Sequence, residues 1–257
     1  MIKRLSMLML LLCAISLAQA PKQSVEDMLR RWINQIVSWS ADPNQLNSPG
    51  TRAELREIER HEQDGTVRYA IYVTGAPRNQ TYALVQVTLA SQEPHALLPE
   101  VFIARDGLVC LDAVPECAQP VALKLAHLKG EPFQGLIVSK DAKYKVTFFV
   151  IPNPITSRDQ GCSVEVIRLT RKFEAALVRG KGFKPNENVK ITGDSAGEAV
   201  NGTAAVQADG SFNTAMMPFV KDKQTGVETA NFKGSACAPT VSFKWGEYEE
   251  NIQKKPP

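Results

Sequence analysis

The chain has 257 residues, 44% of them hydrophobic and 22% charged, with a formal net charge of +3 at pH 7. This length accommodates one large domain or two domains of ordinary size. A small net charge without a basic stripe argues against nucleic acid as a partner.

The first 18 residues have the pattern of an export signal. Lys3 and Arg4 supply positive charge, residues 5–17 are mostly apolar, and small residues follow. We expect cleavage after Ala18, because a proline directly follows the later A-x-A site. The apolar run is shorter than the roughly 20 residues that a membrane-spanning helix needs. We therefore expect a periplasmic or extracellular mature chain of 239 residues (257 − 18), without an integral membrane segment and with a charge of +1 (+3 − 2).

Residues 19–50 are predicted to form one amphipathic helix and a loop. The helix begins at Ser24, and Asp27 three residues later completes an approximate capping box. Apolar residues then recur at helical spacing on one face: Val25, Met28, Leu29, Trp32, Ile36 and Trp39. The polar face mixes acids with arginines, which disfavours a membrane surface. We favour packing of this helix over an adjoining sheet, and binding to a partner is the alternative that the sequence leaves open.

Residues 51–156 are predicted to form a first β-sandwich domain, because the apolar residues now alternate with period two. Asp64–Gly65 indicates a hairpin turn between two strands, of which the first could also be a short helix. Asp106–Gly107 indicates a second turn. Further short strands are expected within residues 81–89, 120–128, 132–139 and 144–152. Prolines at 152 and 154 then interrupt strand pairing and mark the domain boundary.

Residues 157–247 are predicted to form a second β-sandwich domain, followed by a tail over 248–257. About seven short strands are separated by turn residues at nearly regular spacing. Asp209–Gly210 is the strongest hairpin signal in the chain. In the last strand Val241, Phe243 and Trp245 alternate, so we expect these side chains to face the core.

Four cysteines remain after removal of the signal peptide: Cys110, Cys117, Cys162 and Cys237. An even number in an exported chain predicts two disulfides, for which three pairings are possible. We favour Cys110–Cys117, which closes a short loop, together with Cys162–Cys237. The second bridge would tie the first strand of the second domain to the segment that precedes its last strand.

Residues 180–191, GKGFKPNENVKI, carry a recurring pattern in which a strand ends in G-x-G-F and the next begins with V-x-I. The pattern resembles the immunoglobulin-like β-sandwich modules of bacterial surface and envelope proteins, a family of unknown function. The resemblance covers residues 160–246. It implies that the second domain is immunoglobulin-like, and it implies no reaction, since such folds serve many functions. A phosphate loop is not expected here, because a strand follows and the Gly-Lys-Ser/Thr ending is absent.

Residues 193–197, GDSAG, match the G-x-S-x-G pattern of serine hydrolases. That motif requires a helix after the serine and a histidine downstream. Turn residues at Asn201–Gly202 and Asp209–Gly210 leave no room for a helix, and no histidine follows His127. The nucleophile-elbow interpretation therefore fails.

The trypsin-like order His–Asp–Ser remains formally available, with His61, then Asp106 or Asp112, then Ser195. However, His61 lies in a charged hairpin arm, where we expect solvent, whereas a triad needs a dry and preorganised site. We interpret GDSAG as a loop in which Asp194 and Ser195 supply turn hydrogen bonds.

We predict no catalytic residue, no cofactor and no metal site. His61, His95 and His127 are scattered, and no H-E-x-x-H motif occurs. Asn79 and Asn201 begin glycosylation triplets, which matter only in a host that uses them. Three tyrosines could line a sugar-binding face, although packing in the core or on a sheet is favoured: Tyr69, Tyr72 and Tyr82.

The sequence thus predicts a mainly β protein with an N-terminal helix and two β-sandwich domains, the second immunoglobulin-like. Its expected role is non-catalytic binding or structural service at the cell envelope or outside the cell, with a protein or a cell-surface glycan as partner. The alternatives are a secreted serine hydrolase that uses Ser195, and a carbohydrate-binding module.

Overall fold

A computed structural model describes Asn34 and residues 46–87, 94–113 and 116–246. The predicted signal peptide, the predicted N-terminal helix apart from Asn34, and the C-terminal tail lie outside these residues. The described chain is mainly β, and all its strand pairings are antiparallel. It contains no helix long and apolar enough to cross a membrane.

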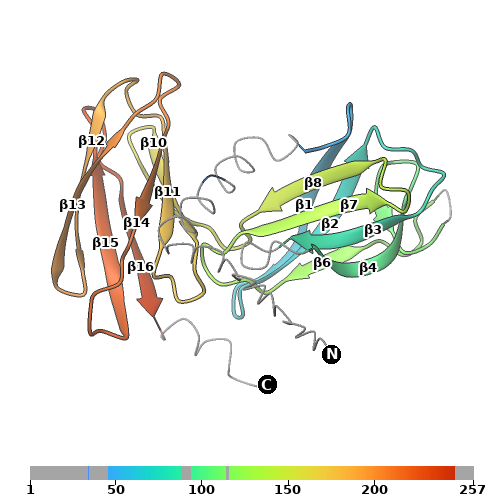
Figure 1. The fold of residues 1–257 in the computed structure, drawn as a ribbon, viewed down its shortest axis with the longest axis horizontal. Helices are drawn as coiled ribbons and strands as arrows, with labels where there is room; N and C mark the ends of the chain where they lie inside the picture. Colours follow the sequence, from blue (N-terminus) through green and yellow to red (C-terminus); the bar gives the residue numbers. More distant parts are fainter. Residues whose placement is uncertain (1–33, 35–45, 88–93, 114–115, 247–257) are drawn as a thin grey trace, which may run out of the picture.

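The strands form two units, which are drawn side by side in Figure 1. The N-terminal unit consists of β1 (Arg52–His61), β2 (Thr66–Thr74), β3 (Tyr82–Val87), β4 (Pro94–Ile103), β5 (Val109–Cys110), β6 (Ala122–Leu125), β7 (Phe133–Ser139) and β8 (Lys145–Val150). The C-terminal unit consists of β9 (Ile155–Asp159), β10 (Cys162–Arg168), β11 (Ala176–Lys181), β12 (Asn188–Ser195), β13 (Glu198–Ala205), β14 (Phe212–Met216), β15 (Thr225–Lys233) and β16 (Thr240–Gly246).

The N-terminal unit has a three-stranded sheet, β1-β2-β6, and a five-stranded sheet, β5-β4-β3-β7-β8. One hydrophobic core contains side chains from both sheets. Alternate residues of β2 point into it, from Val67 to Val73, as a strand period of two requires. The two sheets therefore bury one face each against the other.

The turn at Asp64–Gly65 joins β1 and β2, as the sequence predicts. Gly65 has a φ of 66°, and an Asp64 carboxylate oxygen accepts a hydrogen bond from the Thr66 amide at 2.9 Å. The first arm is a strand over its whole length and not a short helix, because β1 pairs with β2 from Arg52 to His61.

The C-terminal unit has two four-stranded sheets, β14-β11-β10-β9 and β13-β12-β15-β16, which also share one core. As expected, Val241, Phe243 and Trp245 of β16 face this core. The sequence does not indicate β9, which pairs with β10 at the edge of the first sheet.

The prediction of a hairpin at Asp209–Gly210 is wrong. The turn is present, and Gly210 has a φ of 78°, but β13 pairs with β12 whereas β14 pairs with β11. The chain thus passes from one sheet to the other at this point. A turn signal specifies a reversal of direction, and tertiary packing selects the partner of each strand.

The Asn201–Gly202 pair is also not a turn. It lies inside β13, where Gly202 pairs with Ile191 of β12. The turn that precedes β13 occurs earlier, at Ala196 and Gly197, whose φ angles are 50° and 93°. The conclusion that no helix follows Ser195 still holds, because residues 198–205 form a strand.

The glycines of GKGF have separate steric roles. A Cβ on Gly180 would lie 2.0 Å from the ring of Phe212, so the side chain of β14 packs directly on this backbone. Gly182 has a φ of 80°, and a Cβ there would lie 2.3 Å from the carbonyl oxygen of Gly161. Any larger residue would displace one of these neighbours.

The cysteines are paired as the sequence favours. Cys110 is bonded to Cys117 at a sequence separation of 7, and Cys162 to Cys237 at a sequence separation of 75. Cys162 begins β10 in one sheet, and Cys237 lies between β15 and β16 of the other sheet. The long bridge therefore joins the two layers of the C-terminal unit.

The two units meet at Arg168, whose side chain is buried at the end of β10. Its amide donates to the carbonyl of Gly130 at 2.8 Å, and its Nε donates to the carbonyl of Lys129 at 3.1 Å. The guanidinium also lies 4.2 Å from the centroid of the Phe173 ring. An arginine of the C-terminal unit thus holds the loop between β6 and β7 of the N-terminal unit.

Removal of the long disulfide should destabilise the protein more than removal of the short one. The loss of chain-entropy stabilisation is about 4.5 kcal/mol for the 75-residue separation and about 2.5 kcal/mol for the 7-residue separation. Urea denaturation of the double variants Cys162→Ala/Cys237→Ala and Cys110→Ala/Cys117→Ala, beside the oxidised wild type, measures both losses. Equal losses in the two double variants would contradict this ranking.

Candidate functional site

The GDSAG stretch forms the end of β12 and the turn into β13. Ser195 pairs with Glu198, so Ala196 and Gly197 are the two residues of a tight hairpin turn. Their positive φ angles are those that a two-residue hairpin favours. The Asp194 carboxylate accepts a hydrogen bond from the Gly197 amide at 2.9 Å. Asp194 thus supplies the turn hydrogen bond expected of it.

Ser195 has a different role from the one expected, because its side chain faces the core. It is 2% exposed. Its Oγ donates a hydrogen bond to the carbonyl oxygen of Pro218 and accepts one from the indole Nε1 of Trp245 at 3.0 Å. The only hydroxyl proton of Ser195 is therefore directed at a backbone carbonyl, which is not a base that could activate a nucleophile.

The three histidines belong to the N-terminal unit, whereas Ser195 belongs to the C-terminal unit. His61 ends β1 and lies 3.0 Å from the carboxylate of Glu59. His95 is an exposed residue of β4. His127 is half-buried and packs edge-on against the ring of Phe133, and this burial lowers its pKa. No described contact joins any of these imidazoles to Ser195.

The two aspartates considered for a triad serve local turns. The Asp106 carboxylate accepts a hydrogen bond from the Leu108 amide at 3.0 Å. The Asp112 carboxylate accepts from the amides of Ala118 and Gln119 at 3.2 and 3.1 Å. The structure thus does not assemble His61, Asp106 or Asp112 around the serine.

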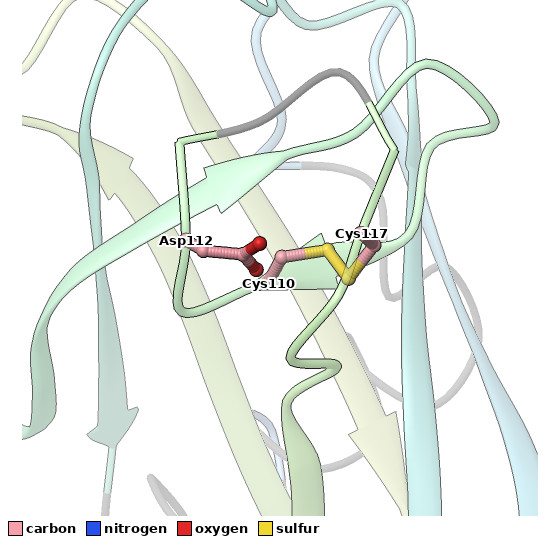
Figure 2. A group of neighbouring side chains, drawn as sticks. All are labelled: Cys110, Asp112 and Cys117. Carbon is pink, nitrogen blue, oxygen red and sulfur yellow. A yellow bond between two sulfur atoms is a disulfide. The ribbon is translucent and has the colours of Figure 1, made fainter.

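Cys110, Asp112 and Cys117 lie together in a group whose atoms resemble a set of metal ligands (Figure 2). In the structure the two sulfurs are bonded to each other, so neither is a thiolate that could bind a metal. The Asp112 carboxylate accepts hydrogen bonds from two backbone amides of the same segment. The group is therefore a loop that a disulfide closes and that the aspartate stabilises.

A buried carboxyl group that the sequence analysis does not single out lies beside this serine. Glu228 of β15 is fully buried, and it is the residue opposite Ser195 in the β12–β15 pairing. Among the described residues, neither of its carboxylate oxygens has a hydrogen-bond partner within bonding geometry. The alternation of β15 could have predicted this burial from the sequence, because Glu228 is on the same face of the strand as the buried Ala230 and Phe232.

Burial raises the pKa of Glu228 from its ordinary value of 4.5 to about 7. The negative charge of Asp194 adds to this rise. Because Ser195 already donates its only proton to Pro218, it cannot also donate one to the neighbouring carboxylate. A protonated Glu228 fits that arrangement better than a carboxylate does.

The N-terminal unit contains a hollow of about 580 Å³. Its walls come from the loop before β3 and from the end of β4, with one residue of the Cys110–Cys117 loop beside them. The lining residues are Arg78, Asn79, Gln80, Thr81, Phe102, Ile103, Arg105 and Ala113. A smaller hollow of about 320 Å³ over the β9–β10 turn is lined by both Arg158 and Asp159.

The three tyrosines considered for a sugar-binding face do not lie together on the surface. Tyr69 and Tyr82 are buried in the core of the N-terminal unit. Tyr72 is half-buried beneath the Arg56 guanidinium, which lies 4.0 Å from its ring centroid. These three rings do not form one exposed platform.

Comparison with known proteins gives no functional identification. No protein-family model and no curated protein matches the chain. Among solved structures, the chain is similar to a tetra-tandem repeat in the extending region of a large adhesion protein, at 16% identity and a TM-score of 0.25. The match covers 76% of this chain and 48% of that structure, so this chain spans about half its length.

Replacement of Glu228 by glutamine should remove a pH dependence of stability. The folded-state pKa of about 7 exceeds the ordinary value of 4.5, so the folded protein binds the additional proton between these values. The free energy of unfolding therefore falls as the pH rises from about 4.5 to 7, by about 3 kcal/mol for this group. Urea denaturation measures the free energy of unfolding at pH 4 and at pH 8. The value at pH 4 minus the value at pH 8 should be smaller in Glu228→Gln than in the wild type, by about 3 kcal/mol.

Glu198→Gln is the matched control, because Glu198 is an exposed residue at the other end of the same hairpin turn. It should retain the pH dependence of the wild type. An unchanged pH dependence in Glu228→Gln would show that the buried carboxyl does not titrate in this range.

Proposed function

We propose that the chain is an exported, non-catalytic protein with two β-sandwich domains and a binding or structural role at the cell envelope or outside the cell. The observation that carries the non-catalytic part is the position of Ser195. Its hydroxyl bridges Trp245 and Pro218 inside the core, and an engaged, buried hydroxyl is not available to a substrate.

Export is supported by the N-terminal sequence and by the cysteines. A charged start, an apolar stretch and small residues precede Gln19. The two disulfides require an oxidising compartment, such as a periplasm or the extracellular space, in order to form and persist. Both observations support export, and the N-terminal sequence alone supports Gln19 as the first residue of the mature chain.

The immunoglobulin-like interpretation of the C-terminal unit rests on its layers. Two four-stranded antiparallel sheets share a core, and the Cys162–Cys237 bridge connects them. The GKGF pattern lies where β11 leaves its sheet for the turn into β12. Such modules present loops and sheet faces to partners and use a packed core for stability, which fits a binding or structural role.

A fluorophosphonate probe separates this function from the alternative, a serine hydrolase centred on Ser195. The folded mature protein should not be labelled, because Ser195 is buried and lacks a described imidazole partner. Mass spectrometry of the peptide that contains Ser195 provides the readout, and an active serine hydrolase treated in parallel is the positive control. Stoichiometric labelling at Ser195 would replace the non-catalytic proposal with the hydrolase.

Cell fractionation tests the export part separately. When a bacterium expresses the full sequence, the protein should appear in the periplasm or the medium with Gln19 as its first residue. Alkylation without prior reduction should leave the four remaining cysteines unmodified. A cytoplasmic protein that retains residues 1–18 would contradict export.

A further inference from the structure

The 580 Å³ hollow of the N-terminal unit has two arginines and no acid among its lining residues. Arg78 approaches it from the loop before β3, and Arg105 from the turn after β4. Both are exposed, and neither forms an ion pair within the part of the chain that the structure describes. The volume is within the range of about 300 to 1,000 Å³ that is usual for ligand pockets.

Three carboxylates near these arginines in sequence are engaged elsewhere. Asp106 accepts its hydrogen bond from Leu108, and Asp112 accepts two from the loop that the short disulfide closes. Glu100 of β4 contacts the ammonium group of Lys140. None of these three carboxylates forms a described ion pair with Arg78 or Arg105, so an anionic ligand would meet two guanidinium groups without an ionic partner among the described residues.

The walls that carry the arginines are held by hydrogen bonds of their own backbone and side chains. The Tyr82 hydroxyl donates to the carbonyl of Pro77 at 2.5 Å, and Gln80 Nε2 donates to that hydroxyl at 2.8 Å. On the other wall the Ala104 amide donates to the carbonyl of Leu108 at 2.9 Å. Loops fixed before binding lose less conformational entropy when a ligand arrives.

A third part of the wall is fixed covalently. Ala113 belongs to the loop that the Cys110–Cys117 disulfide closes, and Cys110 pairs with Phe102, another lining residue. The disulfide, the β4–β5 pairing and the hollow thus share the same few residues. The Cys110–Cys117 disulfide therefore fixes part of the wall of the hollow, in addition to stabilising the fold.

The lining residues fit the groups of an acidic sugar. A guanidinium binds a carboxylate through two parallel hydrogen bonds. The side chains of Asn79, Gln80 and Thr81 offer amide and hydroxyl groups for sugar hydroxyls, and the half-buried ring of Phe102 offers an apolar surface for the C–H face of a pyranose. An acidic peptide would use the arginines and leave most of these neutral polar groups without a matching partner.

We propose that this hollow binds a carboxylate-bearing sugar residue of an acidic polysaccharide, with Arg78 and Arg105 on its carboxylate. The inference rests on the binding role proposed above and gives it a site and a ligand class. It also gives the Asn79 triplet a consequence: a glycan attached to Asn79 would occupy the site, so the protein must be produced in a host without N-glycosylation.

The test uses the full mature chain and a trimer of galacturonic acid as the probe, with the neutral galactose trimer as the matched ligand. Isothermal titration calorimetry should show binding of the acidic trimer alone, and added salt should weaken it. Arg78→Ala and Arg105→Ala should each weaken the affinity at least about tenfold. Arg52→Ala removes an exposed arginine of β1 outside the hollow and should leave the affinity unchanged.

Circular dichroism and thermal unfolding of each variant establish that it is folded, and Arg78→Lys and Arg105→Lys keep the charge while removing the planar fork. An intermediate affinity in the lysine variants supports bidentate binding. Three results overturn the proposal: no binding of the acidic trimer to the folded wild type, equal weakening by Arg52→Ala, or tighter binding of a phosphoserine peptide than of the sugar. None of these depends on Ser195, so labelling by fluorophosphonate and failure of the sugar site are distinguishable.

Discussion

The burial of Trp245 is the constraint on which one end of the C-terminal unit depends. Its ring is 1% exposed, so the indole N–H needs a protein acceptor, and Ser195 provides it. The ring also requires space, because a Cβ on Gly226 would lie 2.5 Å from it. The same tryptophan therefore dictates an inward serine on β12 and a glycine on β15. In this fold the GDSAG pentapeptide, which matches a hydrolase motif, supplies the hydrogen-bond acceptor for a buried indole.

The neighbouring Glu228 shows how this packing sets electrostatics. A carboxyl group without a described partner is stable in a core only while it is neutral, so desolvation raises its pKa towards neutrality. Perturbed carboxyl groups often mark catalytic sites. Here the group lies opposite a serine whose hydroxyl donates to Pro218, and it is buried among core side chains, so its protonation contributes to the pH dependence of stability.

Most strands could be predicted from the sequence because their signals are local, and the disulfides because one short cysteine pair leaves a single remaining pair. Asp64–Gly65 lies between two alternating segments that pair with each other, so the turn and the partner coincide. At Asp209–Gly210 the same signal marks a turn between strands of different sheets, and only the packing of distant segments decides this. Arginine is usually a surface residue, whereas Arg168 is buried between its own unit and the loop of the other unit that it holds. The hollow could not be predicted from the sequence, since Arg78 and Arg105 are 27 positions apart (105 − 78) and line one hollow only in the folded chain.

The long disulfide also determines how the C-terminal unit would transmit a pulling force. A load applied between β9 and the end of β16 would travel through the Cys162–Cys237 bond and bypass residues 163–236 between them. Those 74 residues (236 − 163 + 1) include most of the core strands, so they could not be extended while the bond is intact. Mechanically, the unit would behave as a short tether with a folded body attached, and the length gained under tension would be limited to the segments outside the bridge.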